Sequence, residues 1–238
     1  MIKKLTKKLE FEHFSNLSKE WWDPYGKFKI LHELAPLRIK YIKKMLSRNS
    51  NKNLNKIDIL DIGCGGGLIC EPLARIGANV TGIDFVSENI TSAIRHSKES
   101  NLKIKYLHKD IENIKLNAKY DLIIILEVLE HLDNWKKILN NISKNLKPKG
   151  KLIISTINRN LFSKIFAIFI AENIVKFVPK NTHDYNKLIK PEELTSLLVK
   201  NKFEVIDMTG MIFNPISFEW SLKKNKTKIN YFCTAIKI

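Results

Sequence analysis

From Ile57 onward, short apolar runs alternate with longer amphipathic stretches, and this alternation restricts the chain to few folds. Short apolar runs separated by helix-length segments are typical of strand–helix–strand units around a parallel sheet. The sequence predicts strands of this kind at 57–61, 79–83, 103–107, 120–125 and 151–156. It predicts helices between them at 67–76, 87–99 and 134–146, with a stop at Lys147-Pro148-Lys149-Gly150.

The C-terminal part adds one predicted helix and two predicted strands. The helix opens at Pro191-Glu192-Glu193, and the strand-like runs cover 203–211 and 229–237. An antiparallel edge strand would close a sheet of this kind. We therefore expect an α/β fold with a mostly parallel seven-stranded sheet, an antiparallel edge strand and helices on both faces.

The first fifty residues have a different character, because aromatic and charged residues mix around the turn signal Asp23-Pro24. Helical periodicity appears from about Pro36 to Leu46. We interpret residues 1–50 as an N-terminal helical cap and residues 51–238 as the main domain.

A glycine-rich segment, Asp61-Ile62-Gly63-Cys64-Gly65-Gly66-Gly67, lies between a predicted strand and a predicted helix. Glycines at such a place let the backbone turn tightly and approach a ligand closely. A second acid, Asp84, ends the next strand, where a carboxylate accepts the hydroxyls of an adenosine ribose. Because an acid stands beside the glycines, the loop favours a cationic ammonium and sulfonium over a pyrophosphate. The sequence therefore favours S-adenosylmethionine over a dinucleotide.

These motifs resemble the class I methyltransferase superfamily, which has a Rossmann-like fold. The resemblance implies a set of cofactor-binding residues in this chain: Asp61, Gly63, Gly65, Gly67, Asp84, Asp110 and Leu126. Asp84 would bind the ribose, and Asp110 and Leu126 would contact the adenine. A helix-capping role is the alternative for Asp110.

Four more motifs lie largely outside the cofactor half. They are Phe14 with Trp21-Trp22-Asp23-Pro24 and Phe28-Lys29; Pro36-Leu37-Arg38; Ser155-Thr156-Ile157-Asn158-Arg159-Asn160; and Val178-Pro179-Lys180 through Thr182-His183-Asp184, followed by Ile189-Lys190-Pro191. Together they resemble the ubiquinone-biosynthesis O-methyltransferase family, over nearly the whole chain. Asn181 departs from the pattern, since the family usually has Gly there, but Asn also tolerates left-handed backbone.

This second resemblance implies methyl transfer to a ring hydroxyl of a polyprenylated catechol or quinol, namely 2-polyprenyl-6-hydroxyphenol and 3-demethylubiquinol. It also implies that Arg38 pairs with the cofactor carboxylate, where a surface Arg at a helix start is the alternative. The attacked hydroxyl must lose its proton, although the unperturbed pKa of a phenol is about 10. Some group in the site must therefore lower that pKa.

Glu127, Glu130 and His131 follow the fourth predicted strand and would share one face of a helical turn. In some members of the resembled family the corresponding residues bind a divalent ion, so the three are candidate ligands for Mg²⁺ or another divalent cation that stabilises the catecholate. Metal-free contacts with the substrate are the alternative, and Glu127 and His131 are candidate catalytic residues on either interpretation. The resemblance also makes His183, oriented by Asp184, a candidate catalytic residue, with a structural loop histidine as the alternative.

The formal net charge of +17 suggests nucleic acid or an anionic membrane as a partner. An AT-rich coding sequence would also favour this charge, because only five of the 41 basic residues are arginines. The chain lacks the Asn-Pro-Pro, Asp-Pro-Pro and Pro-Cys motifs of nucleic-acid methyltransferases. We expect no nucleic-acid partner. Another methyltransferase of the same fold and a non-enzymatic membrane-docking protein are the competing interpretations.

An apolar run from Ile165 to Ala171 lies in a predicted insertion near residues 159–190. The run is too short to span a bilayer, and charged residues follow it closely in the sequence. Residues 161–178 are predicted to form an interfacial helix or flap beside the active site, on an anionic membrane surface, with a core helix as the alternative. Because the N-terminus has no apolar signal-peptide core, we expect a cytoplasmic protein. The polyprenylated substrate that the resemblance implies predicts a peripheral position at the inner face of the membrane, and the resemblance also implies a ubiquinone-biosynthesis complex as a partner.

Overall fold

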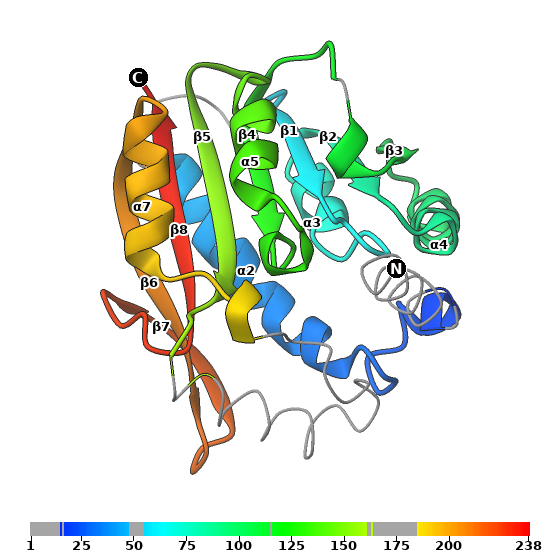
Figure 1. Ribbon diagram of the computed structural model, residues 1–238. Helices are drawn as coiled ribbons and strands as arrows, with labels where there is room; N and C mark the ends of the chain where they lie inside the picture. Colours follow the sequence, from blue (N-terminus) through cyan, green and yellow to red (C-terminus); the bar gives the residue numbers. More distant parts are fainter. Residues whose placement is uncertain (1–14, 16, 48–54, 115, 161–162, 164–184) are drawn as a thin grey trace, which may run out of the picture. The chain divides into compact units, whose positions relative to one another are not determined.

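The computed structural model describes residues 15, 17–47, 55–114, 116–160, 163 and 185–238 (Figure 1). The chain divides into two compact units, Met1–Lys115 and Leu116–Ile238. The predicted boundary near residue 50 and most of the predicted insertion near 159–190 lie outside the described residues. These two domain assignments therefore stay predictions.

The first unit contains three parallel strands in the order β3-β2-β1. They are β1 (Asp58–Ile62), β2 (Asn79–Asp84) and β3 (Lys105–His108), followed by the short 3-10 helix η2 (Ile111–Asn113). Helix α3 (Cys70–Arg75) joins β1 to β2, and α4 (Ser87–Glu99) joins β2 to β3. Strands β1 and β2 are almost entirely buried, as expected for parallel strands covered on both faces. These elements confirm the predicted strand–helix alternation.

The N-terminal region forms a 3-10 turn, η1 (Ser18–Glu20), and a long helix, α2 (Lys29–Ser47). The sequence predicted this helix only from about Pro36, so the start was wrong by seven residues, and Pro36 lies inside the helix. Proline lacks the N–H that an interior helical residue donates, which is why the pattern suggested a boundary there. Buried side chains lie on one face of α2 both before and after Pro36, from Leu34 to Met45. Their burial stabilises the helix on both sides of the proline.

The second unit contains five strands in the order β4-β5-β8-β6-β7. They are β4 (Tyr120–Leu126), β5 (Leu146–Ile157), β6 (Phe203–Asn214), β7 (Glu219–Lys224) and β8 (Asn230–Lys237). The helices are η3 (Leu129–His131), α5 (Trp135–Ser143), η4 (Tyr185–Lys187) and α7 (Pro191–Lys200). Strands β4 and β5 are parallel, whereas β8 is antiparallel to both of its neighbours. The expected antiparallel closure is present.

Two local features of the second unit differ from the predictions. The described residues form eight strands rather than seven, because β7 adds an edge strand whose side chains are exposed or half-buried and give little apolar signal. Residues 147–150, which were predicted to end the preceding helix, lie inside β5, whereas helix α5 ends at Ser143. Tyr120 pairs with Leu146 and Leu122 with Lys151, so residues 147–150 bulge out of the ladder.

In the part of the chain that the structure describes, no helix is long and apolar enough to cross a membrane. The segment 161–178, predicted as an interfacial helix, lies outside the described residues apart from Ser163. Its membrane role stays a prediction.

Candidate functional site

The glycine loop between β1 and α3 uses backbone conformations that glycine adopts without strain. The φ angles of Gly63, Gly65 and Gly67 are 72°, 53° and 93°. The N–H groups of Gly63 and Cys64 both donate to the carbonyl oxygen of Ile83, at 2.8 and 3.0 Å. The loop is thereby fixed to the carboxyl end of β2.

Trp21 packs directly on this loop. A Cβ atom on Gly65 would lie 2.6 Å from the indole Cζ2, and one on Gly66 would lie 2.5 Å from Cγ. The indole stacks on Phe28 with ring centroids 3.9 Å apart, and its Nε1 donates to Asn89 Oδ1 at 2.7 Å. Glycine at positions 65 and 66 therefore makes room for a tryptophan side chain.

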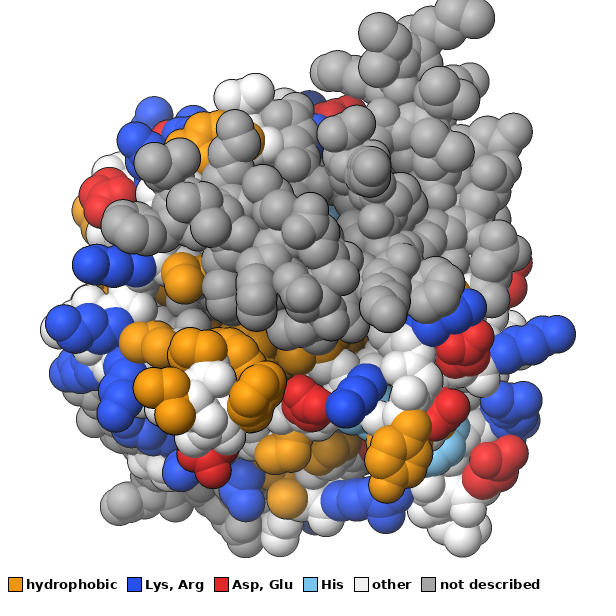
Figure 2. All heavy atoms as spheres, turned by 90° about the horizontal axis from the view of Figure 1, so that it is seen from below, with side chains coloured by type: hydrophobic (Ala, Val, Ile, Leu, Met, Phe, Trp, Pro, Cys, Tyr) orange, Lys and Arg blue, Asp and Glu red, His pale blue; other side chains and the backbone are white. Residues whose placement is uncertain are grey.

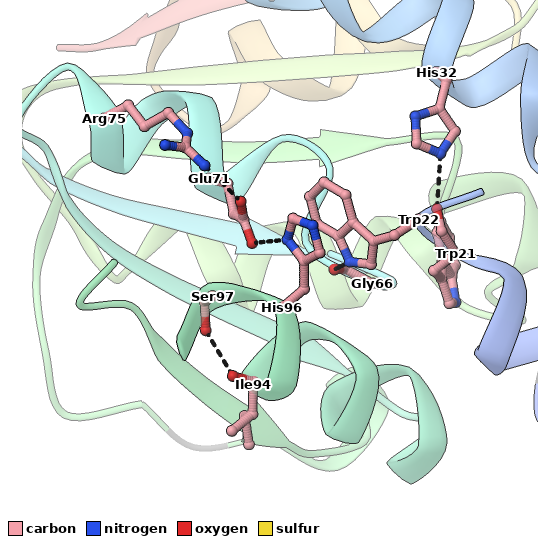
Figure 3. A network of polar contacts seen from close by, with 9 residues as sticks. All are labelled: Trp21, Trp22, His32, Gly66, Glu71, Arg75, Ile94, His96 and Ser97. Carbon is pink, nitrogen blue, oxygen red and sulfur yellow. Dashed lines mark hydrogen bonds and ion pairs between the residues drawn. The ribbon is translucent and has the colours of Figure 1, made fainter. Parts of the chain in front are cut away.

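Trp22 holds the loop through a second set of contacts (Figure 3). Its Nε1 donates to the carbonyl oxygen of Gly66 at 3.0 Å. Its ring lies flat on His96, with centroids 3.4 Å apart and an interplanar angle of 4°. His96 Nδ1 is 2.6 Å from Oε1 of the buried Glu71, which Arg75 also contacts at 3.4 Å. Sequence reasoning missed Glu71 and His96, because neither belongs to a recognisable motif.

Asp84 at the end of β2 also supports the glycine loop. Its Oδ2 accepts the Gly65 N–H at 2.9 Å, and its Oδ1 accepts the Val86 N–H at 2.9 Å and Asn89 Nδ2 at 3.3 Å. Burial raises the pKa of this carboxyl, and the three hydrogen bonds oppose the rise. A carboxylate oxygen has two lone pairs, so Oδ2 keeps capacity for a ligand hydroxyl.

Asp61 at the end of β1 is buried beside Arg38 of helix α2. Its Oδ2 accepts the Cys70 thiol at 3.2 Å. Burial raises the pKa of Asp61 to about 6, and the nearby charge of Asp84 adds to the rise, whereas the charge of Arg38 opposes it. The structure thus brings together Arg38, Asp61 and Asp84, which the sequence had singled out separately.

Asp110 has the alternative role considered from the sequence. Its side chain accepts the Glu112 N–H at 3.0 Å and caps η2. An adenine contact by Asp110 stays a prediction, as does the contact by Leu126, the half-buried last residue of β4 in the second unit.

Glu127 follows β4 directly and has a left-handed backbone, with φ of 55°. Its Oε1 accepts Ser155 Oγ at 2.6 Å and Asn230 Nδ2 at 2.9 Å. A left-handed non-glycine residue costs conformational energy and is often found at functional sites. The two hydrogen bonds fix the carboxylate at the end of the strand.

Glu130 is almost fully buried close to Glu127. Its Oε2 accepts Thr156 Oγ1 at 2.9 Å, whereas Oε1 has no hydrogen-bond partner among the described residues. Burial and the charge of Glu127 raise the pKa of Glu130 to about 8, although His131 and the hydrogen bond from Thr156 oppose the rise. Burial and the neighbouring charge therefore both favour the protonated form of this carboxyl.

The partners of these two acids were not predicted as site residues. Ser155 and Thr156 interrupt the apolar run of β5, and this interruption was the available signal. Asn230 begins β8, which is distant in sequence from both acids, and nothing in its surroundings indicated a role.

The predicted helical turn for a metal site does not form. Glu127 precedes the 3-10 helix η3 in a left-handed conformation, so the three side chains do not share an α-helical face. Within the described residues, no group of three His, Cys, Asp or Glu side chains is placed to hold a metal ion. A metal-binding role for Glu127, Glu130 and His131 stays a prediction. His183 lies outside the described residues.

Comparison with known proteins identifies the family. Residues 32–224 match a family model described as a methyltransferase domain. The chain is 42% identical over 225 residues to the ubiquinone biosynthesis O-methyltransferase of Rickettsia akari (strain Hartford), covering 94% of this chain and 89% of that protein. It is 43% identical over 235 residues to the protein of the same name from Pelagibacter ubique (strain HTCC1062), covering 97% and 98%.

Solved structures show the same fold at low sequence identity. Magnesium protoporphyrin IX methyltransferase from Synechocystis PCC 6803, crystallised with bound SAH, matches with a TM-score of 0.68 and 18% identity, covering 98% of this chain and 100% of that one. A SAM-dependent methyltransferase from Thermotoga maritima matches with a TM-score of 0.68 and 17% identity, covering 96% and 99%. The Rossmann-like class I methyltransferase fold is therefore confirmed.

The family model and the named relatives agree with the arrangement of glycine loop and strand-end acids and with S-adenosylmethionine as the methyl donor. The chain belongs to the ubiquinone biosynthesis O-methyltransferase family.

Proposed function

We propose that the protein methylates a ring hydroxyl of polyprenylated catechol and quinol precursors of ubiquinone, namely 2-polyprenyl-6-hydroxyphenol and 3-demethylubiquinol. The observation that carries this proposal is the pair of acids Glu127 and Glu130 after β4. One is fixed by two hydrogen bonds, and the other is buried with a pKa raised to about 8. Two neighbouring carboxyl groups match the two adjacent hydroxyls of a catechol.

The reaction forms a bond between a ring oxygen and the donor methyl while the bond from that methyl to sulfur breaks. The attacking hydroxyl loses its proton to a base. The ionised form of Glu130, which is populated as the pH rises toward about 8, is suited to accept it. The pKa of Glu130, about 8, is closer to that of a phenol than the pKa of an ordinary carboxyl is. Glu127, fixed by Ser155 and Asn230, would accept a hydrogen bond from the second hydroxyl.

A divalent cation would neutralise the negative charges of Glu127 and Glu130. The charge of Glu127 raises the pKa of Glu130, and a cation would relieve that repulsion and satisfy the buried Oε1 of Glu130. The described conformation does not gather Glu127, Glu130 and His131 into one ligand set. His131 would have to join the two acids before the three could hold an ion, and a divalent cation held there would stabilise the catecholate.

For the methyl donor, the proposed binding residues are those of the first unit around the glycine loop. Asp61 and Asp84 are buried acids with raised pKa values, so a positively charged ligand would stabilise their ionised forms. Arg38, buried on α2, would pair with the carboxylate of the donor. Asp110 is the proposed adenine contact in this unit. The adenine contact of Leu126, in the second unit, is proposed from the resemblance alone.

Asp84→Ala is expected to weaken binding of S-adenosylmethionine by about 1 to 3 kcal/mol, because charged hydrogen bonds to the ribose are lost. Isothermal titration calorimetry measures this change. Asp84 also accepts the Gly65 N–H, so Asp84→Asn serves as the control that keeps an acceptor for the loop. Unchanged affinity in both folded variants would remove Asp84 from the cofactor site.

The proposed substrate class is tested by transfer of labelled methyl from S-adenosylmethionine. A water-soluble catechol with a short prenyl chain is expected to accept the label, and the matched ring with a single hydroxyl is expected to accept at least tenfold less. Chelation is expected to lower the rate on the catechol, and added Mg²⁺ to restore it. Equal transfer to the single-hydroxyl ring, or preferred transfer to tRNA, would contradict the proposal.

The polyprenyl tail of the proposed substrate is insoluble in water. We therefore propose a location at the inner face of the cytoplasmic membrane, within a ubiquinone-biosynthesis complex. The support for this location is the net charge of +17, which favours an anionic surface.

A further inference from the structure

The hairpin formed by β6 and β7 exposes apolar side chains at its tip, defined as residues 214–219. Ile216 is 90% exposed and Phe218 is 79% exposed. In Figure 1 the tip is the lower end of the hairpin, and Figure 2 looks at the molecule from that side. Hydrophobic side chains gather on this face beside Lys and Arg side chains. Large exposed apolar side chains that lie together indicate an interaction surface.

Contacts within the hairpin give the tip a defined shape. Asn214 Oδ1 accepts the Ile216 N–H at 2.9 Å. The ring of Phe213 lies 6.0 Å from that of Phe218 and 5.1 Å from that of Trp220. The exposed side chains are therefore presented by an ordered aromatic base rather than by a frayed loop.

The charges around the tip favour an anionic partner. Between residues 213 and 229 the sequence has four lysines and a single acid, Glu219. Lys223, Lys224 and Lys226 are exposed. An apolar tip followed by lysines matches a phospholipid surface, since apolar side chains enter the headgroup boundary while cations meet phosphates.

Strand pairing places the tip at the same sheet edge as the proposed catalytic acids. Asn230 Nδ2 donates to Glu127 Oε1 at 2.9 Å. In the sheet, Asn230 pairs with Ile157 at the end of β5 and with Met211 in β6. Strand β6 continues from Met211 to Asn214 before the tip begins. At ~3.3 Å per residue, the tip starts about 10 Å beyond the level of Asn230.

We propose that the β6–β7 tip inserts into the headgroup region of an anionic phospholipid bilayer. The insertion holds the sheet edge that carries Glu127 and Glu130 toward the membrane. The substrate side of this inference rests on the proposed function, because only a lipid-borne substrate requires that orientation. Binding of the tip to the bilayer does not depend on it.

The test compares the full-length protein with Ile216→Ser/Phe218→Ser. Co-sedimentation is measured with vesicles of phosphatidylglycerol and phosphatidylethanolamine, and with vesicles of phosphatidylcholine alone. We expect the wild-type protein to bind the anionic vesicles and the double variant to bind them at least tenfold more weakly. Val199→Ser, at a 60% exposed apolar residue of α7, is the matched control and is expected to bind like the wild type.

Activity on the water-soluble catechol separates this inference from the proposed function. The double variant should methylate that catechol at the wild-type rate but lose rate on a long-chain substrate embedded in anionic vesicles. If no catechol is methylated while vesicle binding follows the expected pattern, the proposed function fails and the tip proposal stands. Equal vesicle binding by wild type and double variant, or no binding by the wild type, would overturn the tip proposal.

Discussion

Glu130→Gln is expected to lower kcat for catechol methylation by about 10²- to 10⁴-fold, the usual contribution of a general base. The amide has nearly the shape of the carboxyl group but cannot accept the proton that the catechol releases. Burial and Glu127 raise the pKa of Glu130 to about 8, so its charged form is already disfavoured. A neutral side chain at this position should therefore not unfold the protein. Steady-state kinetics, with affinity for S-adenosylmethionine measured in parallel, would show a fall in kcat at unchanged cofactor binding.

Thr156→Val provides the matched control for this prediction. It removes the hydrogen bond to Glu130 Oε2 and leaves the carboxyl group in place. We expect a fall in activity of about tenfold or less, with the pH at half-maximal rate moved upward because a hydrogen bond to the charged form is lost. A Glu130→Gln variant with wild-type kcat would exclude Glu130 as the base and leave Glu127 as the remaining acid of the pair.

Gly65→Ala is expected to lower the free energy of unfolding by about 2 to 5 kcal/mol. A left-handed alanine costs about 1 to 2 kcal/mol, and overpacking against Trp21 adds about 1 to 3 kcal/mol. Because the same residue lies in the proposed cofactor loop, affinity for S-adenosylmethionine should fall as well. Urea unfolding and calorimetric titration measure the two effects.

Trp21→Leu separates the two causes through a double-mutant cycle. An added methyl at residue 65 meets the far end of the indole, so Trp21→Leu should recover part of the stability lost in Gly65→Ala. An added methyl at residue 66 meets Cβ and Cγ of Trp21, which leucine retains, so Gly66→Ala should show little recovery. Equal coupling at the two glycines would contradict the packing described for the loop.

The fold could be predicted because strands and helices leave local signals. Apolar runs separated by amphipathic segments located the parallel strands to within two residues, except at the start of β5. The glycines with Asp61 and Asp84 indicated the proposed cofactor loop. The start of α2 was missed because Pro36 imitates a helix boundary. Strand β7 was missed because a half-exposed edge strand lacks a continuous apolar run.

The site was predicted less completely, because its contacts join residues that are distant in sequence. Glu127 and Glu130 were identified by their position after a strand, but their partners Thr156 and Asn230 depend on how strands pair. The left-handed backbone of Glu127 is likewise a consequence of tertiary packing, since glutamate has no preference for that conformation.

Trp21 and Trp22, together called the tryptophan clamp, hold the glycine loop through contacts that affect the order of folding. Trp22 meets its partner Gly66 across 44 residues, and Trp21 meets Asn89 across 68. Contacts of this span form only after the intervening chain has closed into a loop, at an entropic cost that local helices do not have. The pairing of β1, β2 and β3 uses none of these contacts. We therefore expect the clamp to dock after the three strands have paired, although its residues are synthesised first, and to open locally at a lower free energy than the sheet.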